Sequence, residues 1–377
     1  LDDYADMIEK LRVDDIHRGH IANHPPGPVV FHWLVNRLLN ANPLLAKEWL
    51  GVREPQLQLL QGQTQRLVGA HVSRPEFAGI WAGGFLLRFL YWLTLPAIYL
   101  IARRLYDART ALIAAALAAL IPSLNIFAPY VDQALPCFAA WAFLLWHVSV
   151  RRKSWAWAAG AGALLALGLL WSLASLLAVA LIGFGTLLIV WKEWRGSPAP
   201  VNWRGWATVA AGGLLGFVLV CLLPKLIFDY DTVRVWKICL SQHAGFAVLF
   251  ERSYLPWLLF NPIEFLVFAG VPLSLFFLWE SATTARTWWR LRAQAALSLS
   301  PWALILVLAV VNVSGKNLGE VARLWMFLMP FAALGAAHGL QRLDRGRGWP
   351  AAWVAGLLAV QTLTFRLVLD VFNLMAE

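Results

Sequence analysis

Charged residues are scarce in this sequence. Lys, Arg, Asp and Glu together make up 14% of its 377 residues, whereas about a quarter is usual for a soluble globular domain. Hydrophobic residues make up 60%, and there are 22 Trp. The mean hydropathy is +0.63. This composition excludes an ordinary soluble domain and indicates an integral membrane protein.

Cysteine is scarce as well, with three residues in the whole chain. Cys137 and Cys221 fall within apolar stretches, and Cys239 stands alone in a predicted loop. This pattern excludes a disulfide framework. The sequence also has no repeat of fixed period and no low-complexity tract, which excludes a repeat architecture.

Long apolar stretches dominate the rest of the chain. A helix needs roughly 20 apolar residues to cross a hydrocarbon core about 30 Å thick. We expect an all-α, polytopic transmembrane helical bundle with about ten membrane helices. They are predicted near 79–101, 111–128, 132–149, 155–172, 174–191, 205–228, 256–278, 296–313, 323–340 and 350–371. Within 205–228, the pair Gly212 and Gly216 has GxxxG spacing, which is typical of close helix packing.

Basic residues alternate between the loops of this bundle. Five loops, 102–110, 150–154, 192–204, 279–295 and 341–349, together hold 15 basic and 4 acidic residues. The alternate loops and the leader 1–78 hold 12 basic and 14 acidic residues. Since short basic loops stay in the cytoplasm, the five basic loops are predicted to be cytoplasmic and the alternate loops extracytoplasmic. The same alternation supports separate fourth and fifth helices. The net charge of +10 is then mainly a topology signal, and we expect no nucleic-acid partner.

The topology makes residues 1–78 an extracytoplasmic first loop, followed by a transmembrane domain over 79–377. The chain begins with Leu1 and has no signal peptide, so we expect a membrane helix upstream of Leu1. Within the loop, Val29–Asn40 has helical periodicity. One face carries Phe31, Leu34, Val35 and Leu38, and the other carries His32, Asn36 and Asn40. Such a helix is too short to span the bilayer, and we expect it to lie flat in the outer interface.

Five cations are predicted near the outer ends of the membrane helices: Arg88, Lys225, Lys316, Arg323 and Arg366. A charge at the bilayer centre costs roughly 2.5–3.5 kcal/mol, so such residues normally have a partner or a function. One interpretation is that each long side chain simply reaches the interface. The number of cations favours a second interpretation, a site for a lipid phosphate. Glu264 is a candidate partner for one of the five.

Acidic pairs in the first loop are candidates for a general base. The pairs are Asp2–Asp3 and Asp14–Asp15, and each could instead cap a helix or lie in a solvated turn. The five His of the loop lack zinc-ligand spacing, so a zinc site is disfavoured. Weak binding of Mg²⁺ or Mn²⁺ at Asp2 and Asp3 fits the preference of hard cations for oxygen ligands.

Four segments resemble the GT-C class of integral membrane glycosyltransferases, in the branch of protein O-mannosyltransferases and the lipid A aminoarabinose transferase. They are "DDYADMIEKL" followed by "HPPGPVVFHWL", "LLRFLYWLTLPAIYLIARRLYDARTALIAAALAALIPSL", "APYVDQALPCFAAWAFLL" and "GEVARLWMFLMPFAAL". Their order, and their placement relative to the predicted membrane, agree with that class. The resemblance covers almost the whole chain.

This resemblance implies an inverting enzyme that moves a sugar from a polyprenyl phosphate to an acceptor outside the cytoplasmic membrane. The acceptor would be a glycan, lipid or protein. The implied base is Asp3 or Asp2, with Asp3 preferred and Asp14 or Asp15 in reserve. Arg323 and Lys316, followed by Arg88 and Lys225, are expected to contact the donor phosphate. The expected cavity residues are His24, Tyr4, Glu320, which would orient Arg323, and Asp132, which could instead cap a helix.

A transporter or flippase of polyprenyl-linked sugars is the alternative class. It should have inverted repeats and helices broken at the membrane midplane, and it needs no long carboxylate-rich outer loop. A non-catalytic scaffold is disfavoured by the cost of the charges within the membrane.

Overall fold

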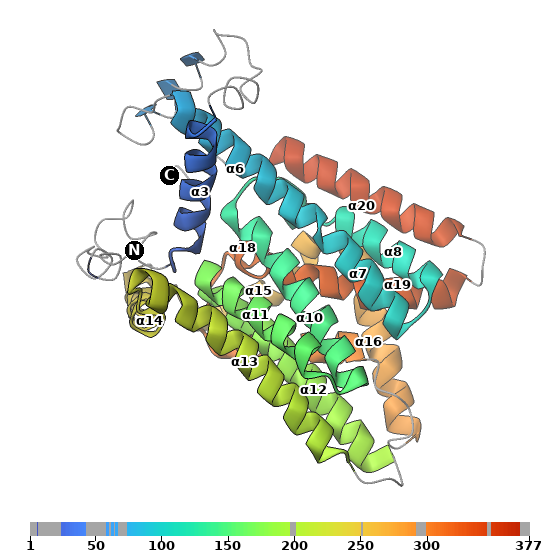
Figure 1. Cartoon of the computed structure of the whole chain (residues 1–377). Coiled ribbons are helices and arrows are strands. Elements are labelled where there is room, and N and C mark those ends of the chain that lie inside the picture. Colours follow the sequence, from blue (N-terminus) through green and yellow to red (C-terminus); the bar gives the residue numbers. More distant parts are fainter. Residues whose placement is uncertain are drawn as a thin grey trace.

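The computed structural model is helical throughout its described part, with no β-strand in it. It describes residues 6, 24–42, 58–59, 62–63, 65–66, 74–196, 201–249, 252–291, 299–344 and 348–369. The helices gather into one bundle, with α3 and the upper part of α6 rising from one end of it (Figure 1). The predicted class, an all-α polytopic helical protein, is confirmed.

The α-helices in chain order are α3 (Gly27–Asn40), α6 (Arg74–Trp92), α7 (Thr94–Leu105), α8 (Ala108–Ala119), α9 (Pro122–Ile126), α10 (Leu135–Arg152), α11 (Trp155–Trp171), α12 (Leu176–Gly196), α13 (Trp203–Phe228), α14 (Thr232–Leu249), α15 (Tyr254–Ala269), α16 (Val271–Leu291), α17 (Leu299–Val313), α18 (Val321–Leu324), α19 (Met329–Asp344) and α20 (Trp349–Val368). The short 3₁₀ helices are η1 (Val131–Ala134), η2 (Leu173–Ser175) and η3 (Met326–Leu328).

Among the described residues, five helices are long and apolar enough to cross a membrane, or six if one bent pair counts as a single span. They are Glu76–Leu105, Val131–Arg152, Leu173–Trp191, Trp203–Phe228 and Trp349–Val368, and the bent pair is Tyr254–Ala269 with Val271–Thr287. The prediction of ten full spans is therefore not confirmed. Ala108–Ala119, Trp155–Trp171 and Pro301–Val313 are apolar but shorter than a full span.

Breaks in the backbone explain most of the difference between the ten predicted spans and the five or six that are found. The predicted span 256–278 is wrong as a straight helix, because the chain bends by 113° between α15 and α16. Gly270 sits at the bend with a φ of 108°, which side chains rarely allow. The predicted span 111–128 breaks where α9 begins at Pro122, since proline cannot donate a helical hydrogen bond. The predicted fourth and fifth spans are separate helices, as expected, with Ser172 extended between α11 and η2.

Two sets of contacts join basic turns that are distant in sequence. The Asp344 carboxylate accepts the backbone N–H of Gly348 and pairs with Arg109, so the α19–α20 and α7–α8 turns meet. Glu193 near the end of α12 accepts the Trp206 indole N–H at 2.9 Å and pairs with Lys153 at 3.8 Å. We call the part of the bundle that carries these turns the basic end.

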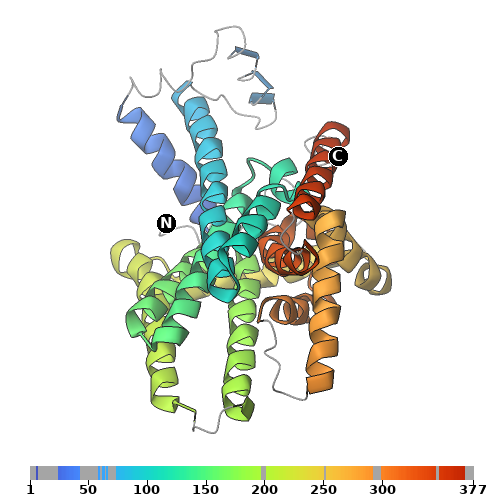
Figure 2. The same cartoon turned by 90° about the vertical axis from the view of Figure 1, so that its right-hand side faces the viewer.

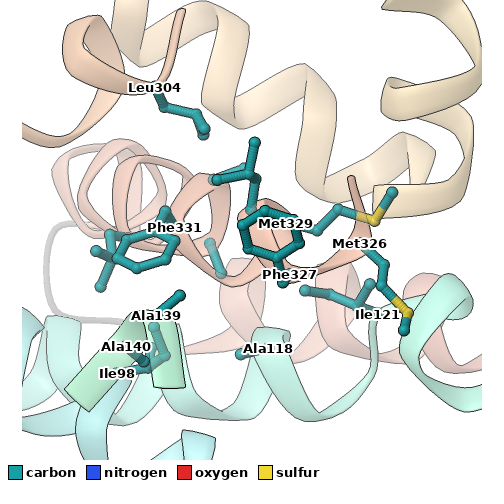
Figure 3. Close-up of a cluster of buried hydrophobic side chains, with 14 of the residues drawn as sticks. Ile98, Ala118, Ile121, Ala139, Ala140, Leu304, Met326, Phe327, Met329 and Phe331 are labelled. Atoms are coloured by element: carbon teal, nitrogen blue, oxygen red, sulfur yellow. The ribbon is translucent and has the colours of Figure 1, made fainter. Parts of the chain in front are cut away.

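The central core lies between α7, α8, α10, α17 and α19. Figure 3 shows Phe331 of α19 beside Ile98 and Ala140, with Leu304 of α17 across from them. All four side chains are buried. The small residues of α8 and α10 allow the bulky η3 and α19 side chains to fill the space between the helices.

The predicted helix is confirmed as α3, but its faces differ from the prediction. Its position flat in the outer interface stays a prediction. His32 and Asn36 turn toward α6, where Gly83 and Gly79 leave room for them. The side chain of Leu38 is instead 69% exposed. In both views α3 lies alongside α6 (Figures 1 and 2). The two glycines of α6, one helical turn apart, determine which face of α3 is buried.

Close packing of α11 on α13 depends on glycine, as the GxxxG pair predicted. A Cβ at Gly216 would overlap the Ala159 carbonyl, whereas one at Gly183 of α12 would meet open space. Gly216→Ala should destabilise the fold by about 1–3 kcal/mol, the usual cost of overpacking. Thermal unfolding in detergent, with Gly183→Ala as the matched control, measures the difference. Equal melting temperatures for the two variants would contradict this account of the α11–α13 contact.

Candidate active site

The chain segment before α18 is held in place by a buried polar residue of α15. Asn261 is fully buried, and its Nδ2 donates to the Asn317 carbonyl at 2.8 Å. Its Oδ1 accepts the Gly319 N–H at 3.1 Å. Gly315 and Gly319 have positive φ, which suits a tight turn between α17 and α18. α15 therefore fixes the loop that carries Glu320 and Arg323.

Arg323 lies at the centre of a group of charged side chains. Its Nη2 donates to Glu320 Oε2 at 2.9 Å, and its Nε lies 3.8 Å from Asp132 Oδ2. Glu320 also faces Arg252, with Oε1 3.5 Å from Nη2. The Arg323 side chain is 12% exposed and that of Asp132 is 13% exposed, so water screens their pair only weakly. We call Asp132, Arg252, Glu320 and Arg323 the Arg323 cluster.

The backbone of Glu320 is strained. Its φ is 57°, a left-handed conformation that costs a residue with a side chain about 1 kcal/mol or more. The Arg252 guanidinium donates to the Leu318 carbonyl at 2.5 Å and lies 5.7 Å from the centre of the Trp257 ring. These contacts hold the loop so that the Glu320 carboxylate faces both Arg252 and Arg323. That Glu320 orients Arg323 for a ligand stays a prediction.

Asp132 reaches Arg323 from the turn between α9 and α10. The Gln133 side chain donates to the Leu124 carbonyl at 2.5 Å, and the Trp171 indole N–H donates to the Val131 carbonyl at 2.9 Å. No side chain caps η1 or α10. Asp132 therefore makes an ion pair across the bundle, and the alternative that it caps a helix is wrong.

The HPPG motif lies close to the same turn. Pro25 and Pro26 are buried, and His24 before them is half-buried. A Cβ at Gly27 would overlap the Leu170 carbonyl at the end of α11, so only glycine allows this approach. Phe31 packs edge-on against Trp171 at 5.4 Å between ring centroids. Trp171 thus links the motif to the backbone beside Asp132.

The five predicted cations do not gather at one place. Arg323 belongs to its cluster, and Lys316 is exposed in the preceding loop. Arg88 and Arg366 both bond to α9. Lys225 pairs with Asp229 at 2.6 Å at the end of α13, on the opposite side of the bundle from α20 (Figures 1 and 2). For Arg88 and Lys225, contact with the donor phosphate stays a prediction.

Glu264 has a different partner from the predicted one. Its carboxylate accepts the backbone N–H of Ala322 at 2.9 Å, at the start of α18. Among the described residues it makes no ion pair, so the expected cation partner is not found. The role of Glu264 is to fix the backbone directly before Arg323.

The predicted base lies outside the described residues. This holds for Asp2, Asp3, Tyr4, Asp14 and Asp15. Asp6 is described, and its Oδ1 lies 2.9 Å from Arg234 Nη2 of α14. Within the described ranges, no three His, Cys, Asp or Glu come together as a metal site. Asp132 and Glu320 have a guanidinium between them, and a metal at Asp2 and Asp3 stays a prediction.

Sequence reasoning missed two residues of this region. Arg252 was counted only as a loop charge, and Asn261 was passed over within an apolar stretch. A buried polar residue in a membrane helix is itself a signal, because its cost requires a partner. Tyr130, beside Asp132, is a third neighbour of the cluster. Burial raises its pKa and the nearby Arg323 lowers it, with burial the larger effect, so the phenol is protonated at neutral pH.

Comparison with known proteins supports the resemblance. No curated protein matches the chain. Residues 77–227, less than half of the chain, match the family of dolichyl-phosphate-mannose-protein mannosyltransferases. This segment begins in α6 and ends in α13, and it includes Asp132 and its turn. The match confirms the resemblance to GT-C-type mannosyltransferases over these residues.

Proposed function

We propose that this protein transfers a sugar from a polyprenyl-phosphate donor to an acceptor hydroxyl on the extracytoplasmic face of the cell membrane. The acceptor is a glycan, a lipid or a protein. The observation that carries the proposal is the Arg323 cluster, in which a nearly buried arginine lies beside the turn that the mannosyltransferase match includes. Arginine pairs well with phosphate oxygens, and phosphate is the leaving group of such a donor.

The reaction is a single displacement at the anomeric carbon. Asp3, or Asp2 beside it, accepts the proton of the acceptor hydroxyl as its oxygen attacks that carbon. The bond between the anomeric carbon and the phosphate oxygen breaks, and its electron pair leaves with the polyprenyl phosphate. Because the acceptor enters opposite the leaving group, the configuration inverts. Arg323 and Lys316 stabilise the negative charge that develops on the phosphate.

Glu320 gives Arg323 a way to exchange partners. It is shared between Arg323 at 2.9 Å and Arg252 at 3.5 Å. A phosphate can therefore replace Glu320 on Arg323 while Glu320 keeps its charge paired with Arg252. Asp132 stays beside the Arg323 Nε and holds the guanidinium in position. His24 and Tyr4 are proposed to line the cavity for the sugar and the acceptor.

The test is release of polyprenyl phosphate from a donor with a labelled sugar by the purified full-length protein, supplied with an envelope extract as acceptor source. We expect release that Asp3→Ala and Arg323→Ala abolish or strongly reduce. Turnover that neither substitution changes would contradict the assigned site.

A flippase of polyprenyl-linked sugars is the second candidate, and one observation favours it. The chain bends by 113° between the apolar helices α15 and α16, as a broken span or a re-entrant loop does, and broken membrane helices are common in transporters. In proteoliposomes, movement of the labelled donor between leaflets without sugar transfer would support this function over the first.

A further inference from the structure

Two arginine side chains donate hydrogen bonds to Asn125 of α9. Arg88 of α6 donates from Nη2 to Asn125 Oδ1 at 2.7 Å, and from Nη1 to the Leu124 carbonyl at 2.9 Å. Arg366 of α20 donates from Nη1 to the Asn125 carbonyl oxygen at 3.1 Å. Two positive charges from different helices are therefore held on one residue.

No described carboxylate forms an ion pair with either arginine. The hydrogen-bond partners of Arg88 and Arg366 are neutral backbone and amide oxygens. The Arg88 guanidinium also lies 4.9 Å from the centre of the Tyr91 ring. The Nε and Nη2 groups of Arg366 make no hydrogen bond within the described part of the chain. Two like charges that bind the same residue repel each other, so the arrangement favours an anion between or beside them.

The location identifies what kind of anion fits. Arg366 is exposed near the end of α20. Apolar side chains near each arginine in sequence are exposed as well, Phe85 and Phe89 on α6 and Leu363 and Leu367 on α20. α9 itself is buried except for Asn125, which is half-buried. A ligand here needs a phosphate for the arginines and an apolar chain for the helices, which is the chemistry of a phospholipid.

α9 contacts both this pair and the Arg323 cluster. Ser123 donates to the Ala322 carbonyl beside Arg323, and Asn125, two residues later, binds Arg88 and Arg366. Arg323 is 12% exposed within its cluster, whereas Arg366 is exposed and has exposed apolar neighbours on α20, so we assign the ligand beside Asn125 to the bilayer. This assignment replaces the predicted contact of Arg88 with the donor phosphate. We propose that Arg88, Asn125 and Arg366 form a second phosphate site, which binds an anionic glycerophospholipid of the bilayer between α6 and α20.

Retention of phosphatidylglycerol by the purified full-length protein tests this site. Native mass spectrometry in detergent would count lipid bound to the wild type, to Arg366→Gln and to Arg366→Lys. We expect the Gln variant to retain several-fold less lipid and the Lys variant an intermediate amount. Arg204→Gln is the control, because Arg204 is an exposed arginine in the first turn of α13, near the basic end.

Two results would overturn the proposal. One is equal loss of lipid in Arg366→Gln and Arg204→Gln, which would make the binding a general property of exposed arginines. The other is displacement of phosphatidylglycerol from the Arg366 site by an equimolar amount of polyprenyl phosphate, which would make this site part of the donor path. Neither result depends on whether the protein transfers a sugar, so this test and that of the proposed function fail separately.

Discussion

Arg323→Gln should lower kcat for sugar transfer by about 10²- to 10³-fold, the usual effect of removing one group that stabilises charge in a transition state. The arginine is 12% exposed and is the proposed partner of the departing phosphate. Arg323→Lys keeps the charge but loses the planar fork, so it should recover part of the rate. Release of polyprenyl phosphate under saturating donor gives kcat for each variant.

The control for Arg323 is an arginine in a similar pair elsewhere in the bundle. Arg342 lies 3.3 Å from the buried Glu280, near the basic end, and Glu280 also contacts His338 at 2.8 Å. Arg342→Gln should reduce thermal stability, because it removes one partner of a buried carboxylate, and should leave kcat unchanged. If both substitutions reduce kcat in proportion to their effect on thermal stability, then Arg323 has only a structural role.

Asp3→Asn should lower kcat by about 10²- to 10⁴-fold with little change in donor affinity, because the amide has the shape of the carboxylate but cannot accept the proton. Asp2→Asn is the parallel variant and identifies which of the two is the base. Turnover of each is measured with labelled donor, and donor affinity is measured by binding to the purified protein.

Asp6→Asn is the matched control for the acidic pair. Asp6 belongs to the same segment, and its side chain is 52% exposed and paired with Arg234. Exposed ion pairs contribute little, so this variant should behave nearly as the wild type. Normal turnover in both Asp2→Asn and Asp3→Asn would rule out this pair as the base and leave Asp14 and Asp15 as the remaining candidates.

The sequence predicted the elements that depend on local pattern. Apolar stretches and alternating basic loops located most helices, because both signals are carried by neighbouring residues. α3 was found from its periodicity, but its buried face was not. That face depends on Gly79 and Gly83 of α6, which are more than 40 residues away in the chain and leave room for polar side chains.

The bend at Gly270 has a local signal, because Pro272 follows the glycine at the start of α16, but the apolar stretch continues through it, so a prediction from hydropathy treats it as one span. The sequence alone also could not show which of the predicted cations lie close together in space. Predicted depth placed Arg88, Arg323 and Arg366 at a similar height, but height does not determine which side of the bundle a residue faces. The structure assigns Arg88 and Arg366 to α9 and gives Arg323 three charged neighbours, including Arg252 through their shared Glu320.

The location of the reaction is tested most directly by measuring on which face of the membrane sugar transfer takes place. Membrane vesicles of known orientation would receive a short-chain, water-soluble polyprenyl-phosphate sugar whose head group does not cross the bilayer. Sugar transfer should occur in vesicles that expose the Arg323 cluster, and in those that expose the basic end only after detergent is added. Transfer in intact vesicles that expose the basic end, with none in the others, would contradict a site at Arg323.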